Sequence, residues 1–95
     1  MREVKRKVAA VDARLESVER EAQEISADQQ RLRDNIKALE KAPDARQLIV
    51  RYVGKANEQE TRMEQLTNER KTARQERDRL QAELDQVFRE LEPKL

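Results

Sequence analysis

The side chains best suited to acid–base or metal chemistry in this chain are carboxylates, because the sequence contains no histidine and no cysteine. General acid–base catalysis needs carboxylates gathered in a cleft that shifts their pKa values. The 20 Asp and Glu residues are instead spread along the chain among 21 Lys and Arg residues. Without cysteine and histidine, the chain can form no disulfide, has no thiol chemistry and lacks the usual transition-metal ligands. We therefore predict a protein that is not an enzyme, with no cofactor and no metal site.

A basic cluster in the second half of the chain is the candidate site for a phosphate backbone. It consists of Arg70, Lys71, Arg74, Arg77 and Arg79. Acidic residues interrupt it, the net charge is +1, and 2% of residues are aromatic, so continuous positive potential and stacking side chains are both missing. The single glycine also excludes a Gly-rich phosphate loop. We expect a solvated face, and keep as an alternative a nucleic-acid-binding helical arm like that of a seryl-tRNA synthetase.

The elements that position these side chains follow from the apolar spacing. With 43% charged residues the chain cannot fill an ordinary compact core, but a narrow apolar stripe remains possible. Alternating steps of three and four residues from Met1 to Leu39 meet apolar side chains everywhere except Gln29. This heptad repeat is typical of a helix in a left-handed coiled coil. The positions are Met1, Val4, Val8, Val11, Leu15, Val18, Ala22, Ile25, Gln29, Leu32, Ile36 and Leu39.

A second helix with the same repeat is predicted after a break at Pro43. Proline disfavours helical geometry at the preceding residue, and Asp44 with Gln47 resembles an N-cap with its capping-box partner. The second seam is Ile49, Tyr52, Ala56, Gln59, Met63, Leu66, Arg70, Ala73, Arg77, Leu80, Leu84, Val87 and Leu91. We predict an all-α fold, an antiparallel two-helix coiled-coil hairpin with helices at about residues 2–41 and 44–92, forming one domain of residues 1–95.

Folding the chain back at Asp44 pairs seam residues whose numbers add up to 88. The neutral polar residues of the two seams, Gln29 and Gln59, then face each other and are expected to set the register, because slippage would separate the two amides. Arg70 and Arg77 would extend their guanidinium groups past the seam to Glu19, Glu21 or Asp12. The same register predicts edge pairs of Lys7 with Glu83, Arg14 with Glu76, Asp28 with Arg62, Asp12 with Arg74 and Glu40 with Arg46, and a repulsion between Glu21 and Glu69.

Apolar residues outside the seam mark both ends of the hairpin. At the turn, Leu48 and Val53 are expected to widen the core, whereas Val50 points away from the partner helix and suggests a docking patch for another protein or a second hairpin. At the open base, Phe88 and Leu91 would need partners numbered before Met1. The chain is therefore expected to be a fragment of a larger protein, or to form a homodimer that covers these two residues.

The turn region resembles the middle coiled-coil segment of the bacterial mucoidy-inhibitor-like proteins. The likeness rests on "RLRDN" near the end of the first helix, a short polar turn, and "RYVGKANEQETRMEQL" opening the second. It implies a non-catalytic spacer or assembly element in a bacterial, envelope-associated protein of uncharacterised function, with β-rich flanking domains. The family offers no catalytic residues to carry over.

Function is predicted from these features together. The absence of any run of about 18 apolar residues and the charged N-terminus predict a soluble segment with no membrane insertion. We expect a rigid arm that spaces or self-associates flanking domains, with protein as its partner. A chaperone-like tentacle that grips apolar clients through Phe88 and Leu91 is a further alternative.

Overall fold

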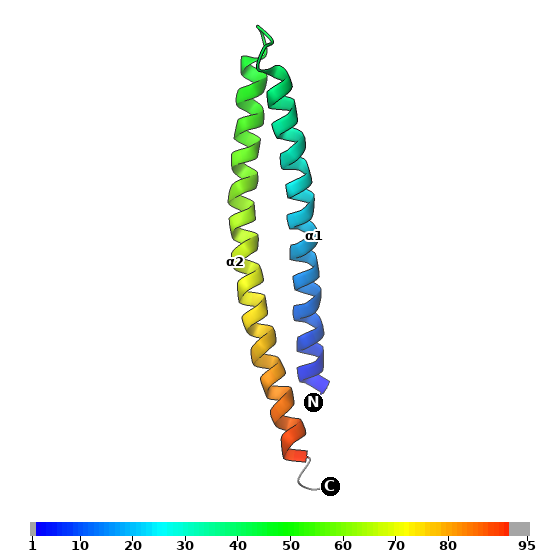
Figure 1. Cartoon of the computed structure of the whole chain (residues 1–95). Helices are drawn as coiled ribbons and strands as arrows, with labels where there is room; N and C mark the ends of the chain where they lie inside the picture. The colour runs from blue at the N-terminus through cyan, green and yellow to red at the C-terminus, as the bar shows by residue number, and fades with distance from the viewer. Residues whose placement is uncertain (1, 92–95) are drawn as a thin grey trace. The chain divides into compact units, whose positions relative to one another are not determined.

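The computed structural model describes residues 2–91 and contains two long helices packed against each other (Figure 1). Helix α1 is Arg2–Leu39 and helix α2 is Arg46–Leu91, and they are antiparallel. The predicted all-α hairpin is therefore confirmed. Residue 92, at the predicted end of the second helix, and Met1, the first predicted seam residue, lie outside the described residues.

The chain divides into two compact units, and each contains a part of both helices. The base unit comprises Met1–Glu19 and Asn68–Leu95, and the tip unit comprises Arg20–Thr67 with the turn. Each unit is built in the same way, because a stretch of α1 packs on the antiparallel stretch of α2 that belongs to the same unit.

The predicted seam forms the core of both units. Among the described residues, every seam position is buried or half-buried except Leu91. The largest fully buried side chains are Leu80 in the base unit and Leu32 and Leu66 in the tip unit. Burying one such leucine stabilises the fold by about 2 kcal/mol. The heptad positions therefore account for the core except for Ala45 in the turn.

The turn is longer than predicted, because α1 ends at Leu39 and α2 begins at Arg46. The Ala45 N–H donates to the Ala42 carbonyl at 3.4 Å, which places Pro43 and Asp44 at the centre of a four-residue turn. No described residue has a positive φ, so the turn is type I rather than type II. Proline suits the second position of a type I turn, since its ring fixes φ near the required value.

The predicted N-cap is wrong by one residue. The first hydrogen bond of α2 runs from the Ile49 N–H to the Ala45 carbonyl at 2.9 Å, so Ala45 occupies the N-cap position. Asp44 belongs to the preceding turn and its side chain is exposed. Ala45 is 7% exposed and adds to the core instead of capping the helix through a side chain.

Two polar contacts between the helices in the base unit agree with the predicted register. In the base unit, Arg77 Nε donates to Asp12 at 2.6 Å and Arg70 donates to Glu19 at 3.4 Å. Both pairs lie within one residue of the register in which numbers add up to 88. The expected extension of the two seam arginines toward acidic residues of the other helix is therefore confirmed. The aliphatic part of each arginine covers the seam while its charge stays near water.

The predicted edge pairs are wrong where the structure tests them. Asp12 binds Arg77 rather than Arg74, and Glu21 binds Arg62. The expected repulsion between Glu21 and Glu69 stays a prediction. Several other charged side chains form ion pairs with residues one turn away on their own helix, where the side chains are neighbours. These pairs are Lys7 with Glu3, Arg31 with Asp28, and Arg79 with both Glu76 and Glu83.

Candidate interaction surfaces

A polar layer crosses the core of the tip unit at Gln29 and Gln59, both of which are half-buried. The Gln59 side-chain amide donates from Nε2 to Asp28 Oδ2 at 2.5 Å. Its Oε1 atom is buried and has no hydrogen-bond partner among the described residues. The partner of Gln59 is thus the carboxylate next to Gln29 rather than the Gln29 amide. Whether these two glutamines set the register stays a prediction.

The carboxylates around this layer are held in their charged form. The hydrogen bond from Arg31 Nε, at 2.8 Å, and then the one from Gln59 lower the pKa of Asp28 below its ordinary value. The same Arg31–Asp28 hydrogen bond raises the pKa of Arg31. In the neighbouring turns, Arg62 forms a bidentate pair with Glu21. Its Nε and Nη2 atoms donate to the two carboxylate oxygens at 2.5 and 2.9 Å, and these hydrogen bonds lower the pKa of Glu21. Charge-assisted pairs of this kind add directional contacts beside the apolar seam.

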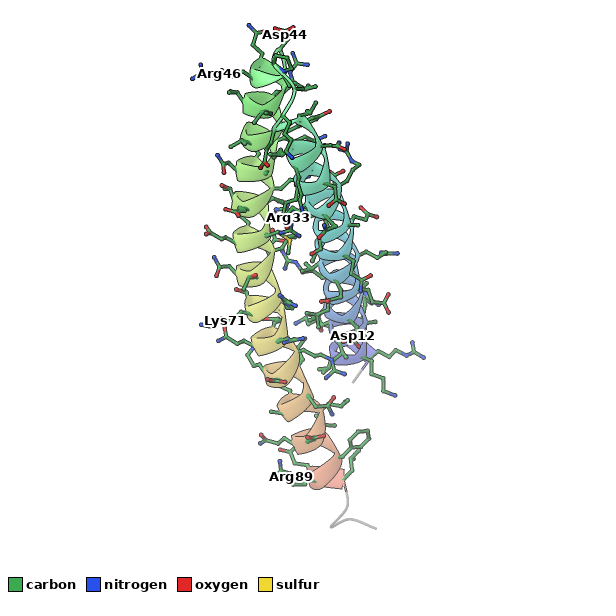
Figure 2. The ribbon with its side chains drawn as sticks, turned by 45° about the horizontal axis from the view of Figure 1, so that its top comes forward. Asp12, Arg33, Asp44, Arg46, Lys71 and Arg89 are labelled. Atoms are coloured by element: carbon green, nitrogen blue, oxygen red, sulfur yellow. The ribbon has the colours of Figure 1, made fainter. Side chains whose placement is uncertain are left out.

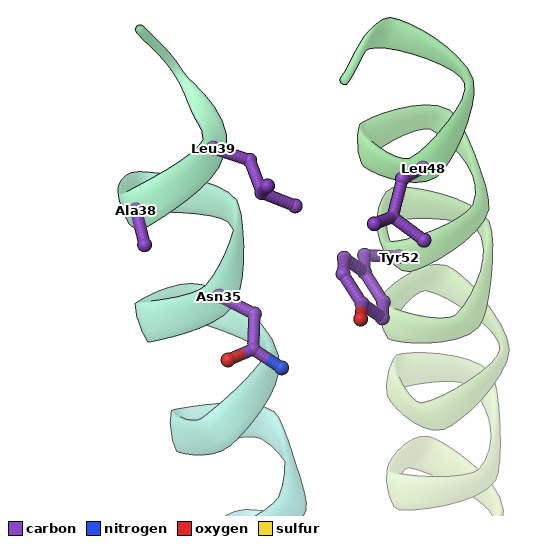
Figure 3. Close-up of a pocket in the computed structure, with 5 residues that line it drawn as sticks. All are labelled: Asn35, Ala38, Leu39, Leu48 and Tyr52. Carbon is purple, nitrogen blue, oxygen red and sulfur yellow. The ribbon is translucent and has the colours of Figure 1, made fainter. Parts of the chain in front are cut away.

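A shallow groove lies beside the turn, between the end of α1 and the start of α2 (Figure 3). Leu39 projects from α1 toward Leu48 and Tyr52 on α2, as the close-up shows. The groove is lined by Asn35, Ala38, Leu39, Leu48 and Tyr52. Leu48 is 36% exposed, so it widens the apolar contact only in part. The polar atoms of the groove come from Asn35 and Tyr52, which sequence reasoning did not assign to a site.

Val50 and Val53 form a separate apolar surface on α2. Val50 is 66% exposed, as its predicted outward position requires, and Val53 is 42% exposed. Val53 therefore adds less to the core than expected. Near the turn, Arg46 projects from α2 away from α1 (Figure 2).

Phe88 and Leu91 lie exposed near the end of α2 in the base unit. Phe88 is 45% exposed and Leu91 is 50% exposed. Residues of α1 leave both side chains uncovered, in agreement with their predicted lack of partners. Whether a flanking domain or a second copy covers them stays a prediction.

The basic cluster of α2 is largely neutralised within the chain. Arg70 and Arg77 bind acidic residues of α1, and Arg79 binds Glu76 and Glu83 on its own helix. Lys71 projects away from α1 in Figure 2. A phosphate backbone would have to displace these internal partners, so the cluster is a weak candidate for anion binding.

The described residues contain no group of three acidic side chains placed to hold a metal ion, and neither α1 nor α2 has an apolar stretch suited to crossing a membrane. No protein-family model matches the chain, and no curated protein or solved structure matches it.

Proposed function

We propose that the chain is a non-catalytic structural arm that spaces or self-associates the domains of a larger bacterial protein. The observation that carries this proposal is the seam, which is continuous and mostly apolar through the described part of both helices. A narrow seam of this kind stiffens two helices against each other and leaves their outer faces free for solvent and partners. Cross-helix ion pairs in each unit add to the stiffness.

The sequence resemblance supports the setting of this arm. The "RLRDN" and "RYVGKANEQETRMEQL" segments flank the turn, as in the mucoidy-inhibitor-like coiled coils. In that family the coil lies between β-rich domains, so we place the arm in a bacterial, envelope-associated protein. The nucleic-acid alternative has less support, because three arginines of the basic cluster already bind acidic residues of the chain.

Rigidity is the property that separates an arm from a flexible linker, and spin-label distances measure it. The chain has no cysteine, so Lys5→Cys and Lys37→Cys place two labels on exposed sites of α1 alone. With a rise of about 1.5 Å per residue, a straight helix puts them about 48 Å apart. We expect one narrow distance distribution near that value.

A shorter label pair serves as the control for this measurement. Glu24→Cys with Lys37→Cys lies within the tip unit and should give about 20 Å. If the short pair is narrow while the long pair is broad or bimodal, α1 bends between the two units and a rigid arm is ruled out. The chaperone alternative is tested separately, because Phe88→Ser should then abolish suppression of client aggregation.

A further inference from the structure

The shallow groove beside the turn has the size of an anchor site for one side chain. We call it the tip groove, and its lining residues are Asn35, Ala38, Leu39, Leu48 and Tyr52. Its volume is about 220 Å³. Pockets that enclose a small-molecule ligand are larger, at about 300 to 1,000 Å³. The tip groove therefore suits one apolar side chain of a larger partner better than a complete small molecule.

Two polar side chains of the tip groove are free to bind the backbone of such a partner. Asn35 extends from α1 toward α2, and Tyr52 extends from α2 toward α1 (Figure 3). Neither side chain forms a hydrogen bond with another described residue. The amide and the hydroxyl can each donate and accept. This arrangement suits a peptide, because every peptide residue except proline carries an N–H and a carbonyl beside its side chain.

The turn end of the tip unit carries a surplus of cations. Residues 31–55 contain seven basic and three acidic residues, a net charge of +4. Arg31 is the one member of the seven that forms an ion pair with a described residue, namely Asp28 at 2.8 Å. Farther from the turn in the same unit, Arg62 binds Glu21. The other cations near the turn thus lack internal partners of this kind, and they favour a partner that brings carboxylates.

Two of these cations lie beside the tip groove. Arg51 follows Leu48 by three positions on α2, and Lys55 follows Tyr52 by three positions. Residues three apart on a helix have neighbouring side chains. Both cations are exposed, so a partner seated in the groove can reach them.

We propose that the tip groove binds an acidic peptide segment of another protein, with one apolar side chain of the segment seated between Leu39 and Leu48. Carboxylates of the segment then pair with Arg51 and Lys55, and its backbone binds the polar side chains of the groove. This inference adds a partner to the structural arm and does not depend on the rigidity of the arm. The contact is small and partly ionic, so we expect weak binding that weakens further at high salt.

An anionic lipid surface would attract the same cations but fits the groove less well. Helices that lie on lipid insert protruding apolar side chains. The apolar residues of the tip groove line a recess instead. In addition, Asp44 is exposed in the turn and would be repelled by anionic headgroups.

A random peptide library tests which chemistry the tip groove selects. Displayed peptides without tyrosine and tryptophan would be selected on the wild-type chain and then depleted on an Ala38→Glu variant. This substitution places a carboxylate in the groove at an exposed helical position. We expect the remaining peptides to be rich in aspartate and glutamate around one leucine, isoleucine or phenylalanine. If no peptide remains, or if the remaining peptides lack this pattern, the proposal is wrong.

The fluorescence of Tyr52 reports whether a selected peptide binds at the groove itself. The chain contains one tyrosine and no tryptophan, so its emission comes from this side chain. Titration of the peptide should change the emission until it saturates, and the dissociation constant should agree with that from isothermal titration calorimetry. A peptide that binds by calorimetry without changing the emission binds elsewhere and would overturn the proposal.

Matched charge reversals separate the tip groove from the overall charge of the turn end. Arg51→Glu should raise the dissociation constant by about tenfold or more, because it repels peptide carboxylates beside Leu48. Arg46→Glu makes the same change on the same helix, but Arg46 projects away from α1 (Figure 2). At physiological salt this control should raise the dissociation constant by less than about twofold. Val50→Asp, outside the groove, should act as weakly, and circular dichroism checks that each variant is helical.

The remaining outcomes distinguish the proposal from its rivals. Equal losses with Arg51→Glu and Arg46→Glu would mean that binding follows net charge, which would overturn a groove site. Binding to phosphatidylserine vesicles that Arg51→Glu abolishes, in a chain that selects no peptide, would assign the cations to a lipid surface. The spin-label distance along α1 reports on the arm alone. A narrow distance without peptide binding would therefore remove the groove proposal and leave the arm function standing.

Discussion

The base unit and the tip unit both place polar residues at seam positions, but the residue types differ. In the base unit the seam includes Arg70 and Arg77, whose charges reach Glu19 and Asp12 at its edge. In the tip unit the seam includes uncharged Gln29 and Gln59, and the Gln59 amide binds a carboxylate beside the seam. The comparison shows that a narrow coiled coil tolerates a charge at its seam when the side chain is long enough to carry it to the surface.

The difference also affects how strongly each polar residue is tied to its position. An arginine at the seam keeps its charge near water, so it requires no hydrogen-bond partner inside the core. Gln59 is shorter, and its buried Oε1 atom remains without a hydrogen bond. A buried acceptor in this state costs about 1 to 3 kcal/mol. The polar seam residue Gln59 therefore destabilises the tip unit, whereas the seam arginines of the base unit cost little stability.

The largest expected effect comes from removing one core leucine in each unit. Leu32→Ala in the tip unit and Leu80→Ala in the base unit should each lower the free energy of unfolding by about 2 to 4 kcal/mol, because both side chains are fully buried. Urea denaturation followed by circular dichroism measures this. Leu48→Ala, at a partly exposed position, is the control and should cost clearly less. Two separate transitions in either variant would show that the units unfold independently, whereas a single transition would show that they are coupled.

Replacing the polar seam residues should sharpen the contrast between the units. Gln59→Leu removes both an unsatisfied buried acceptor and the hydrogen bond to half-buried Asp28. It should raise the free energy of unfolding by about 1 kcal/mol, because the relieved acceptor and the added apolar burial outweigh the lost hydrogen bond. Arg77→Leu should change it less, because the arginine already covers the seam and satisfies Asp12. Paired urea titrations at one salt concentration compare the two. A larger gain for Arg77→Leu than for Gln59→Leu would reverse our ranking of the two units.

Acid should weaken the tip unit through Glu21 and Asp28. Their unfolded-state reference values are 4.5 and 3.8, and their pKa values in the folded chain are lowered by hydrogen bonds from Arg62 and Arg31, respectively. Because folding lowers these pKa values, the stabilisation is present above the reference values and is lost as the pH falls through the lower folded values.

Neutral analogues of the two carboxylates test this pH dependence. Thermal unfolding between neutral pH and about pH 2 should show a steeper loss of stability for the wild type than for a Glu21→Gln/Asp28→Asn variant. Parallel curves for the two proteins would mean that the two pairs do not contribute to stability.

The smallest expected effect is at the turn that closes the tip unit. Asp44→Ala should change the free energy of unfolding by less than about 0.5 kcal/mol, because Ala45 rather than Asp44 occupies the N-cap position. Loss of a true N-cap side chain typically costs about 1 kcal/mol. Thermal unfolding at neutral pH is sufficient to distinguish the two values. If Asp44→Ala lowers the free energy of unfolding by about 1 kcal/mol, Asp44 caps the helix in solution.

The amino-acid sequence determined the two helices, the residues of the seam and the position of the turn. These features follow from local properties: the heptad repeat identifies which face of each helix is buried, and Pro43 interrupts helical geometry. The extension of Arg70 and Arg77 toward acidic residues could also be predicted, because a long charged side chain at a seam position has only the edge to reach.

Only the tertiary structure decided which charged groups pair and which residue begins α2. Arg62 binds Glu21 rather than the predicted Asp28, and alternative ion pairs that differ by a fraction of a kcal/mol cannot be ranked from sequence spacing. Ala45 is the N-cap because the hydrogen bond from its N–H to the Ala42 carbonyl places Asp44 inside the preceding turn. Periodicity specifies the buried face of a helix because burial of many side chains acts together, whereas each surface pair depends on the exact placement of a few atoms.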